Sequence, residues 1–210
     1  FTIIDHEKKL QKIENINEFI NTKNCFFKDN DIGLIKLDNI YFTRLNAYDY
    51  NKKINFSFAG YSRVWETLTK KIFNKKKSEL IMKKIYSENL YYFDFAMGNY
   101  LHAFIDTFPY IYQYLYLQKY IPDLKLLLPT RQPTYVYDFI NFYVNKDNIN
   151  LWDKSRCKIK TLYLGTFKNH KDKHNRLGYR NYILKNTYTK ILKDSLKLKD
   201  ETKLYDRIYI

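Results

Sequence analysis

From residue 88 onward the chain alternates between two apolar patterns, and this alternation limits the folds that it can adopt. A buried strand is predicted at 89–96, and a short continuous apolar run ended by Pro129 predicts another at 123–129. Two more strands are predicted at 148–153 and 157–165. Helical spacing of apolar residues predicts helices at 99–120 and 134–144. Strand, helix, strand, helix and strand in this order is typical of an α/β fold. Its sheet is parallel, with helices on its faces.

Residues 1–87 follow a different pattern. Their sequence predicts a charged helix, a small β-rich lead-in with hairpins and a basic helix at 5–22, 31–65 and 67–84. The lysines of the basic helix are typical of a solvated helix face, although a phosphate or membrane patch is the alternative. We therefore expect two units, an N-terminal unit at 1–87 and a Rossmann-like α/β domain at 88–210.

Composition limits the class of protein less than the patterns do. The 210 residues are 45% hydrophobic, which is enough for a real core, and carry a formal charge of +15. That charge favours phosphate-bearing or acidic partners: nucleic acid, nucleotide or anionic lipid. The sequence is also rich in Lys, Asn, Ile and Tyr and poor in Gly and Pro, which is the usage of an AT-rich genome. We therefore give the charge little weight.

The two cysteines and the apolar runs exclude several site types. Cys25 and Cys157 lie far apart with no CxxC partner, so we expect packed thiols and neither a zinc site nor a disulfide scaffold. No run approaches the roughly 18 apolar residues of a membrane-spanning helix. The start has no signal-peptide pattern and is not Met, so we expect trimming from a longer chain and leave localisation open.

A polar group opens the helix predicted at 99–120. Asn99, His102 and Asp106 are spaced by three and four residues, so they share one side of that helix near its first turns. In parallel sheets, ligands bind where strands hand over to helices. A carboxylate four residues from an imidazole can fix its tautomer and raise its basicity, as a general base requires. The structural alternative is a capping Asn99, a satisfied Asp106 and a core His102, and spacing alone favours it.

Residues 98–165 also resemble glycosyltransferase family 61. Members of that family carry a "GNY.H...D..P" helix, a "PD..LL.P" strand, an amphipathic helix and an apolar strand. The corresponding segments here are "GNYLHAFIDTFPYIYQYL", "IPDLKLLLP", "YVYDFINFYV" and "IKTLYLG". Their order and spacing match the family.

The resemblance implies an inverting, nucleotide-sugar-dependent glycosyltransferase of the GT-B kind, with two Rossmann-like halves. The second half holds most of the donor, the first meets a glycan or protein acceptor, and neither a cofactor nor a metal is obligatory. At the positions that match, the resemblance implies that His102 is the base or an acceptor contact. Asp106 would orient His102 or act as the base. Substrate-positioning roles would fall to Asn99, Gly98 and Tyr100.

The resemblance departs from the family at the donor side. The arginine-bearing segment that follows a "KIYISR"-like strand in the family is missing here. Arg176, Arg180 and Arg207 are partial substitutes as donor-phosphate contacts. Because "LYDRIYI" resembles the strand that leads into the second domain, we expect this chain to be the acceptor-side half. A further domain or a second subunit would then complete the site, and the oligomeric state is open.

The competing class is a basic nucleic-acid-binding module without catalytic activity. It is motivated by the charge of +15, by 22 tyrosines and by "KNHKDKHNR". Most tyrosines, however, fall at core-like spacings, and no recognition motif is present. His170 and His174 in the basic run lack a supporting carboxylate or thiolate, so no metal site is expected.

Overall fold

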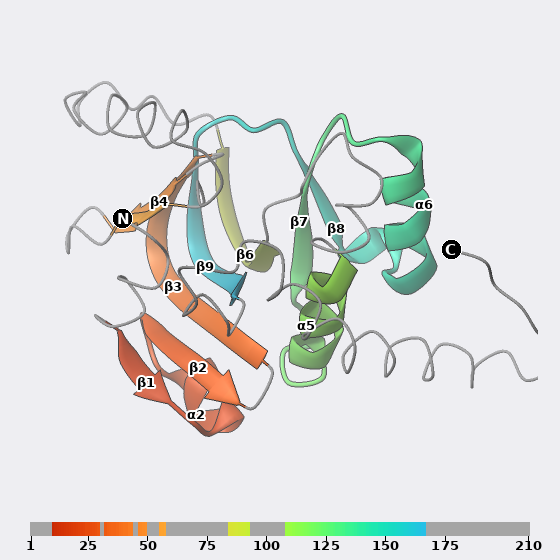
Figure 1. The fold of residues 1–210 in the computed structure, drawn as a ribbon. Coiled ribbons are helices and arrows are strands. Elements are labelled where there is room, and N and C mark those ends of the chain that lie inside the picture. Colours follow the sequence, from red (N-terminus) through yellow and green to blue (C-terminus); the bar gives the residue numbers. More distant parts are fainter. Residues whose placement is uncertain are drawn as a thin grey trace, which may run out of the picture.

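The computed structural model describes residues 10–29, 32–43, 46–49, 55–57, 84–92 and 108–166 (Figure 1). The described strands are β1 Gln11–Ile13, β2 Cys25–Asp29, β3 Ile32–Thr43, β4 Asn46–Asp49, β5 Asn55–Ser57, β6 Lys84–Tyr92, β7 Lys125–Pro129, β8 Ile149–Trp152 and β9 Cys157–Thr166. The described helices are α2 Ile16–Asn21, α5 Phe108–Gln118, α6 Thr134–Tyr143 and the 3-10 helix η3 Lys146–Asn148. All of these strands belong to one mixed sheet, which makes the fold α/β.

The C-terminal part of the sheet is parallel, as the sequence predicts. Its strands lie in the order β9-β6-β7-β8, and every neighbouring pair is parallel. Helix α5 lies between β6 and β7 along the chain, and α6 lies between β7 and β8. The predicted strands and helices after residue 88 are therefore confirmed where the structure describes them. β6 begins at Lys84, ahead of its predicted start at 89.

The N-terminal strands extend the same sheet. β3 pairs antiparallel with β9 from Gly33 opposite Thr166 to Phe42 opposite Cys157. On its other side β3 pairs antiparallel with β2, and β2 pairs parallel with β1. The unit boundary expected between residues 87 and 88 falls inside β6, so the β-rich lead-in and the α/β part share one sheet.

The helix predicted at 5–22 is wrong over residues 11–13. That segment is β1, whose residues pair with Cys25 to Phe27 of β2. The helix begins only at Ile16, where the Asn15 side chain accepts hydrogen bonds from the backbone N–H groups of Asn17 (2.8 Å) and Glu18 (3.4 Å). Strand pairing across the chain therefore overrides local helical spacing, and an N-cap fixes the start of α2.

The two faces of the sheet carry separate apolar clusters, because neighbouring strand residues point to opposite faces. The helix-side cluster consists of Ile13, Phe19, Cys25, Phe27, Leu34, Tyr91, Ile111, Tyr114, Leu117, Ile121, Leu124, Leu126, Leu128, Val136, Ile140, Val144 and Tyr163. The strand-side cluster consists of Leu10, Phe26, Ile35, Leu37, Ile40, Phe42, Tyr86, Leu90, Tyr92, Leu127, Trp152, Cys157, Ile159, Leu162 and Leu164. Only the first contains residues of α2, α5 and α6, so the described α-helices cover one face.

The sheet is strongly curled. The ring of Trp152 on β8 lies 4.8 Å from that of Phe42 on β3 and 5.8 Å from that of Tyr92 on β6, between centroids. β8 and β3 are four positions apart in the strand order, about 19 Å in a flat sheet. Residues 153–156 alone connect the end of β8 to the start of β9, because the curl brings these two ends together: Trp152 ends β8 and contacts Phe42, which pairs with Cys157 at the start of β9.

Candidate functional site

The order of the parallel strands locates the candidate site at one edge of the sheet. The chain runs from β6 to β7 to β8 in one direction and then returns to the other side of β6 for β9. β6 and β9 end together, with Tyr92 opposite Leu164. In open parallel sheets, ligands bind beyond the carboxyl ends of the strands where the order reverses. The edge between Tyr92 and Thr166 is therefore the candidate site.

None of the residues predicted to form the site lies among the described residues. Gly98, Asn99, Tyr100, His102 and Asp106 belong to the connection 93–107, which joins β6 to α5. Arg176, Arg180 and Arg207 follow β9 along the chain. The structure describes the residues that flank the connection, Tyr92 and Phe108. It also describes β9, the strand that precedes the three arginines. The roles of these eight residues stay predictions.

A buried polar contact lies at this edge. Tyr91 on β6 is fully buried, and its hydroxyl donates a hydrogen bond to Oε1 of Gln113 on α5 over 3.0 Å. Gln113 is itself only 5% exposed. Burial raises the pKa of Tyr91 well above its ordinary value, so the hydroxyl stays protonated and remains a donor at physiological pH.

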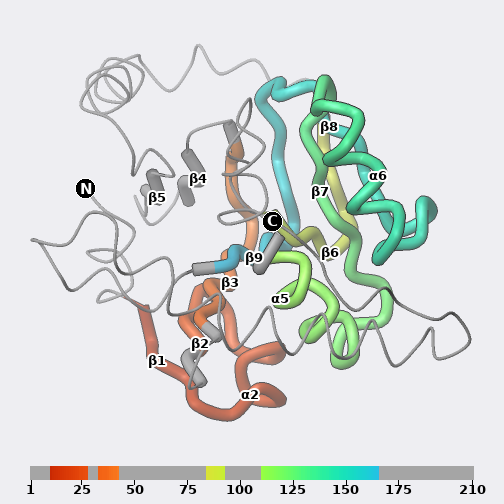
Figure 2. The backbone as a smooth tube through the Cα atoms, turned by 45° about the vertical axis from the view of Figure 1, so that its right-hand side comes forward, coloured from red at the N-terminus to blue at the C-terminus, as the bar shows by residue number. Residues whose placement is uncertain are grey.

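Gly165, near the end of β9, completes this contact. A Cβ atom at Gly165 would collide with Gln113 Oε1, the Tyr110 ring and the Tyr91 hydroxyl. α5 therefore packs directly on the backbone of β9, and Figure 2 shows α5 beside the end of that strand. Gly165, Tyr91 and Gln113 were not among the residues predicted from the sequence to form the site. The available signals were a glycine closing an apolar strand and a glutamine between apolar helix positions.

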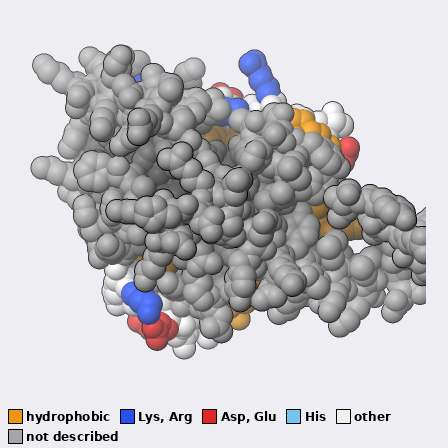
Figure 3. All heavy atoms as spheres, viewed as in Figure 1, with side chains coloured by type: hydrophobic (Ala, Val, Ile, Leu, Met, Phe, Trp, Pro, Cys, Tyr) orange, Lys and Arg blue, Asp and Glu red, His pale blue; other side chains and the backbone are white. Residues whose placement is uncertain are grey.

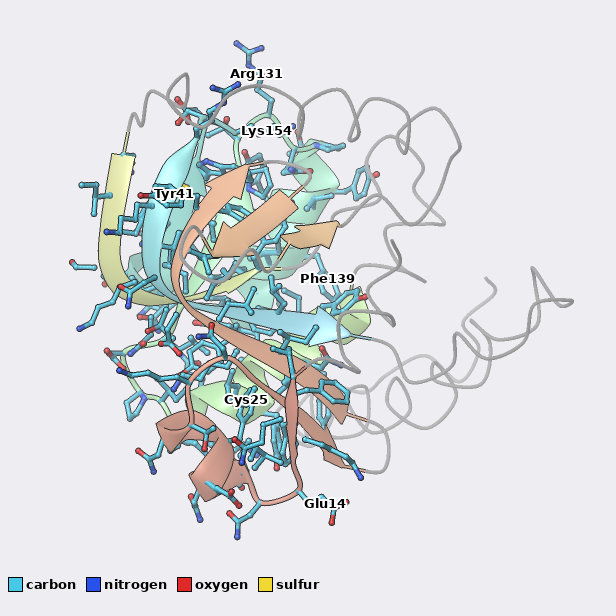
Figure 4. The ribbon with its side chains drawn as sticks, turned by 90° about the vertical axis from the view of Figure 1, so that its left-hand side faces the viewer. Glu14, Cys25, Tyr41, Arg131, Phe139 and Lys154 are labelled. Atoms are coloured by element: carbon cyan, nitrogen blue, oxygen red, sulfur yellow. The ribbon has the colours of Figure 1, made fainter. Side chains whose placement is uncertain are left out.

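The loops after β7 and β8 form a second polar region at the same end of their strands. The Thr130 N–H donates to the Trp152 carbonyl over 2.7 Å, which ties the two loops together. Each loop holds a basic residue in the left-handed region, Arg131 at φ 63° and Lys154 at φ 65°, and Figure 4 shows both at one end of the molecule. On the face in Figure 3, the described Lys and Arg side chains lie apart rather than in one patch.

The two cysteines are packed thiols, as predicted. Both are free and fully buried, Cys25 in the helix-side cluster and Cys157 in the strand-side cluster. Burial raises the pKa of each thiol from 9.0 to about 12. Neither therefore forms a reactive thiolate at neutral pH.

The described part of the chain has neither a cluster of metal ligands nor a helix that could span a membrane. No group of three or more His, Cys, Asp or Glu side chains in these residues is arranged to hold a metal ion. None of the helices in the same residues is long and apolar enough to cross a bilayer.

The chain was compared with protein families, with curated proteins and with solved structures, and none of the three comparisons gave a significant match. The resemblance to glycosyltransferase family 61 consequently rests on the sequence motifs alone.

Proposed function

We propose that the chain is the acceptor-side half of an inverting, nucleotide-sugar-dependent glycosyltransferase, and that its α/β sheet is Rossmann-like, as in one half of a GT-B enzyme. The observation that carries the proposal is the order of the parallel strands, β8-β7-β6-β9. The chain adds β7 and β8 on one side of β6 and then returns to add β9 on the other side. The connection that follows β6 is the one that contains the family-61-like motif. The motif therefore follows the strand after which such sheets bind ligands.

The proposed chemistry uses the residues of that connection. An inverting displacement needs one base to take the proton of the acceptor hydroxyl while the sugar's bond to the diphosphate breaks. His102 is the proposed base or acceptor contact, with Asp106 orienting it or acting in its place. Gly98, Asn99 and Tyr100 are proposed to position the acceptor. Positive groups must stabilise the departing diphosphate, and Arg176, Arg180 and Arg207 are the candidates within this chain.

The burial of described tyrosines favours this proposal over a nucleic-acid-binding module. Base stacking needs an exposed ring face. Five tyrosines of the described part of the chain are instead buried in the two apolar clusters, namely Tyr86, Tyr91, Tyr92, Tyr114 and Tyr163. These residues support the core, so part of the high tyrosine content has a structural explanation.

Binding to a glycan array tests the acceptor-side role directly. The 210-residue chain is compared with His102→Ala and with His170→Ala, a matched control because His170 has no proposed role. We expect glycan binding by the chain and by His170→Ala, with at least about tenfold weaker binding by His102→Ala, equivalent to one lost charge-assisted hydrogen bond. Absence of glycan binding would contradict the proposal. So would nanomolar binding of single-stranded oligonucleotides with a steep salt dependence.

Nucleotide release tests the reaction itself. The chain is incubated with UDP-, GDP- and CMP-sugars and with any glycan that binds on the array. Release of free nucleotide that is lost in His102→Ala and kept in His170→Ala would identify a working transferase within these 210 residues. If glycans bind but no donor reacts, the donor site must be completed by a further domain or subunit, as the departure from the family implies.

A further inference from the structure

A polar row crosses the helix-side face of the sheet, beside the apolar cluster of that face. It consists of Asp38 on β3, Thr161 on β9, Asn89 on β6 and Asp123 in the turn before β7. Thr161 is the register partner of both Asp38 and Asn89. Its hydroxyl donates to Asp38 Oδ1 over 3.0 Å, and Asn89 Nδ2 donates to Asp123 Oδ2 over 3.0 Å. The row therefore spans three neighbouring strands and has a carboxylate at each end.

Lys36 and Tyr163 lie next to the polar row. They are register partners on β3 and β9, and each lies two residues along its strand from Asp38 or Thr161, so the four side chains share one face. That face is the helix side, because Tyr163 belongs to the helix-side cluster. Lys36 Nζ lies 5.9 Å from the centroid of the Tyr163 ring. An ammonium group and a phenol thus adjoin the polar row.

Both of these side chains are nearly buried, yet they keep hydrogen-bonding capacity. Lys36 is 6% exposed and uses one of its three donors on the Ile20 carbonyl of α2. Tyr163 is 3% exposed, and its hydroxyl makes no hydrogen bond to another described residue. The Tyr163 hydroxyl is not fully enclosed, in contrast to that of Tyr86, so a group from outside the protein can reach it. Polar groups in such surroundings call for a partner, which a ligand can supply.

The charges around the Tyr163 hydroxyl indicate which ligand would fit. The carboxylates of Asp38 and Asp123 outnumber the ammonium group of Lys36, so an anionic ligand is disfavoured. Burial raises the pKa of Tyr163, and the nearby Asp38 adds to this effect, so the hydroxyl stays protonated at neutral pH. Carboxylates only accept hydrogen bonds, an ammonium group only donates them, and a phenol does both. The hydroxyl groups of a ligand can serve all three.

We propose that Lys36, Tyr163 and Asp123 bind a neutral ligand rich in hydroxyl groups, such as a sugar unit, on the helix-side face. Lys36 and Tyr163 donate hydrogen bonds to the ligand, and Asp123 accepts one from it. Tyr163 lies three residues before Thr166, so the ligand lies about 10 Å from the end of β9. This site is therefore separate from the candidate site at the strand ends, and it does not depend on the proposed function.

Ligand-observed NMR with glucose, galactose, mannose and xylose tests the proposal on the full chain. Glucose 6-phosphate is the anionic comparison, and about 0.3 M salt screens contacts with the excess positive charge of the chain. We expect at least one neutral sugar to bind in the millimolar range, at least about tenfold more tightly than glucose 6-phosphate. Absence of neutral-sugar binding, or equally tight binding of the phosphate, would overturn the inference.

Matched tyrosine and aspartate variants locate the binding. Tyr163→Phe should weaken sugar binding about fivefold, whereas Tyr114→Phe should not change it, because the Tyr114 hydroxyl is bonded inside the protein to the Leu124 carbonyl. Asp123→Asn should weaken binding about tenfold, and Asp138→Asn, at an exposed position of α6, is its control. Unchanged binding in Tyr163→Phe or in Asp123→Asn would contradict the proposed site.

Thermal unfolding checks that Tyr163→Phe keeps the fold. The hydroxyl has no hydrogen-bond partner among the described residues, so Tm should stay within about 2 °C of the wild-type value. A larger fall in Tm would mean that the hydroxyl bonds within the protein, and it would also overturn the inference.

His102→Ala separates this inference from the proposed function. Neutral-sugar binding that is weakened in Tyr163→Phe and kept in His102→Ala would support the site on the helix-side face, even in a chain without transferase activity. Glycan binding that is lost in His102→Ala and unchanged in Tyr163→Phe would instead keep the transferase proposal and overturn this one.

Discussion

The two faces of the sheet are stabilised in different ways. On the helix side, buried polar groups make defined hydrogen bonds: Tyr91 to Gln113, Tyr114 to the Leu124 carbonyl, and Lys36 to the Ile20 carbonyl over 2.5 Å. On the strand side, Trp152 lies at the centre of a group of aromatic rings, where it meets Phe42 and Tyr92, and its indole N–H donates to the Ser155 carbonyl over 2.8 Å. Aromatic pairs also occur on the helix side, such as Phe19 with Phe27 at 5.5 Å between centroids, so the faces differ in emphasis: polar contacts fix the helices, and the larger aromatic group fills the strand side.

The difference between the two faces reflects what packs on each of them: helices on one face, and the curled sheet itself on the other. Hydrogen bonds are directional, so those on the helix side hold α2 and α5 at one place on the sheet. Apolar and aromatic packing depends mainly on how well side chains fill the available volume. On the strand side, this packing stabilises the curled shape of the sheet. Side-chain variants on the two faces should therefore differ in kind. Loss of volume should dominate on the strand side, and loss of single polar contacts should matter on the helix side.

The largest effect is expected from Trp152→Ala on the strand side. Trp152 is fully buried at the centre of the aromatic group, so its truncation leaves a large cavity and should lower the free energy of unfolding by about 3–5 kcal/mol. Urea unfolding measures this change. Phe142→Ala, at a position 56% exposed, is the control and should change stability by less than about 0.5 kcal/mol. A loss below about 1 kcal/mol in Trp152→Ala would break the comparison.

Gly165→Ala should have the next largest effect, and it acts on the helix side. The added methyl group would overlap Gln113, Tyr110 and Tyr91, so α5 must move away from β9. Overpacking of this kind lowers the free energy of unfolding by about 1–3 kcal/mol. The control is Lys160→Ala at an exposed position of the same strand, with a change of less than about 0.5 kcal/mol. Wild-type stability in Gly165→Ala would mean that α5 does not pack closely on β9.

A rise in pH above 9 should lower the free energy of unfolding through the buried thiol on each face, Cys25 on the helix side and Cys157 on the strand side. The folded state holds the pKa of Cys25 and Cys157 at about 12, above the ordinary 9.0, so the unfolded chain loses these protons first. Stability from each thiol is complete below pH 9 and falls between about pH 9 and 12, on the order of 1 kcal/mol per pH unit. Urea unfolding at pH 8 and pH 10 checks this.

The single variants Cys25→Ala and Cys157→Ala sharpen the pH test. Each should remove a similar part of the loss of stability between pH 8 and pH 10, because the cause is burial on either face. A pH dependence carried by only one of the thiols would show that the two faces bury them differently.

The smallest effects come from single tyrosine hydroxyls. Tyr114→Phe on the helix side should lower the free energy of unfolding by about 1–2 kcal/mol, since it removes both the bond that the hydroxyl donates to the Leu124 carbonyl and the bond that it accepts from the Gln118 amide over 3.0 Å. The Tyr86 hydroxyl on the strand side is buried and has no hydrogen-bond partner among the described residues. Tyr86→Phe should accordingly change stability by less than about 0.5 kcal/mol or increase it. Thermal unfolding compares the two, and equal losses would contradict the difference between the faces.

Much of the parallel half could be predicted from the sequence because its signals are local. The run "KLLLP" has the continuous apolar pattern of a strand buried on both faces, and β7 contributes Leu126 and Leu128 to one cluster and Leu127 to the other. α6 follows the helical spacing of Val136 and Ile140, which are its buried residues. For the candidate site, the sequence places the start of the motif shortly after β6, but the motif lies outside the described residues and stays a prediction.

Other features have no local signal and depended on the tertiary structure. Residues 11–13 have helical spacing, yet they form β1 because β2 offers them a pairing edge. The pairing of β3 with β9 joins residues more than a hundred positions apart, which makes one sheet of two patterns that look separate in sequence. The Tyr91–Gln113 contact at Gly165 likewise requires three elements to meet.

The sequence by itself thus determined which segments of the parallel half become strands and helices, since side-chain periodicity depends only on near neighbours along the chain. The tertiary structure decided three features: the partner of each strand, the curl that brings Trp152 to Phe42, and the close packing of α5 on β9 at Gly165. These depend on hydrogen bonds and packing between distant segments. The free energy of such a contact depends on both elements that make it, so it cannot be predicted from the sequence of either element alone.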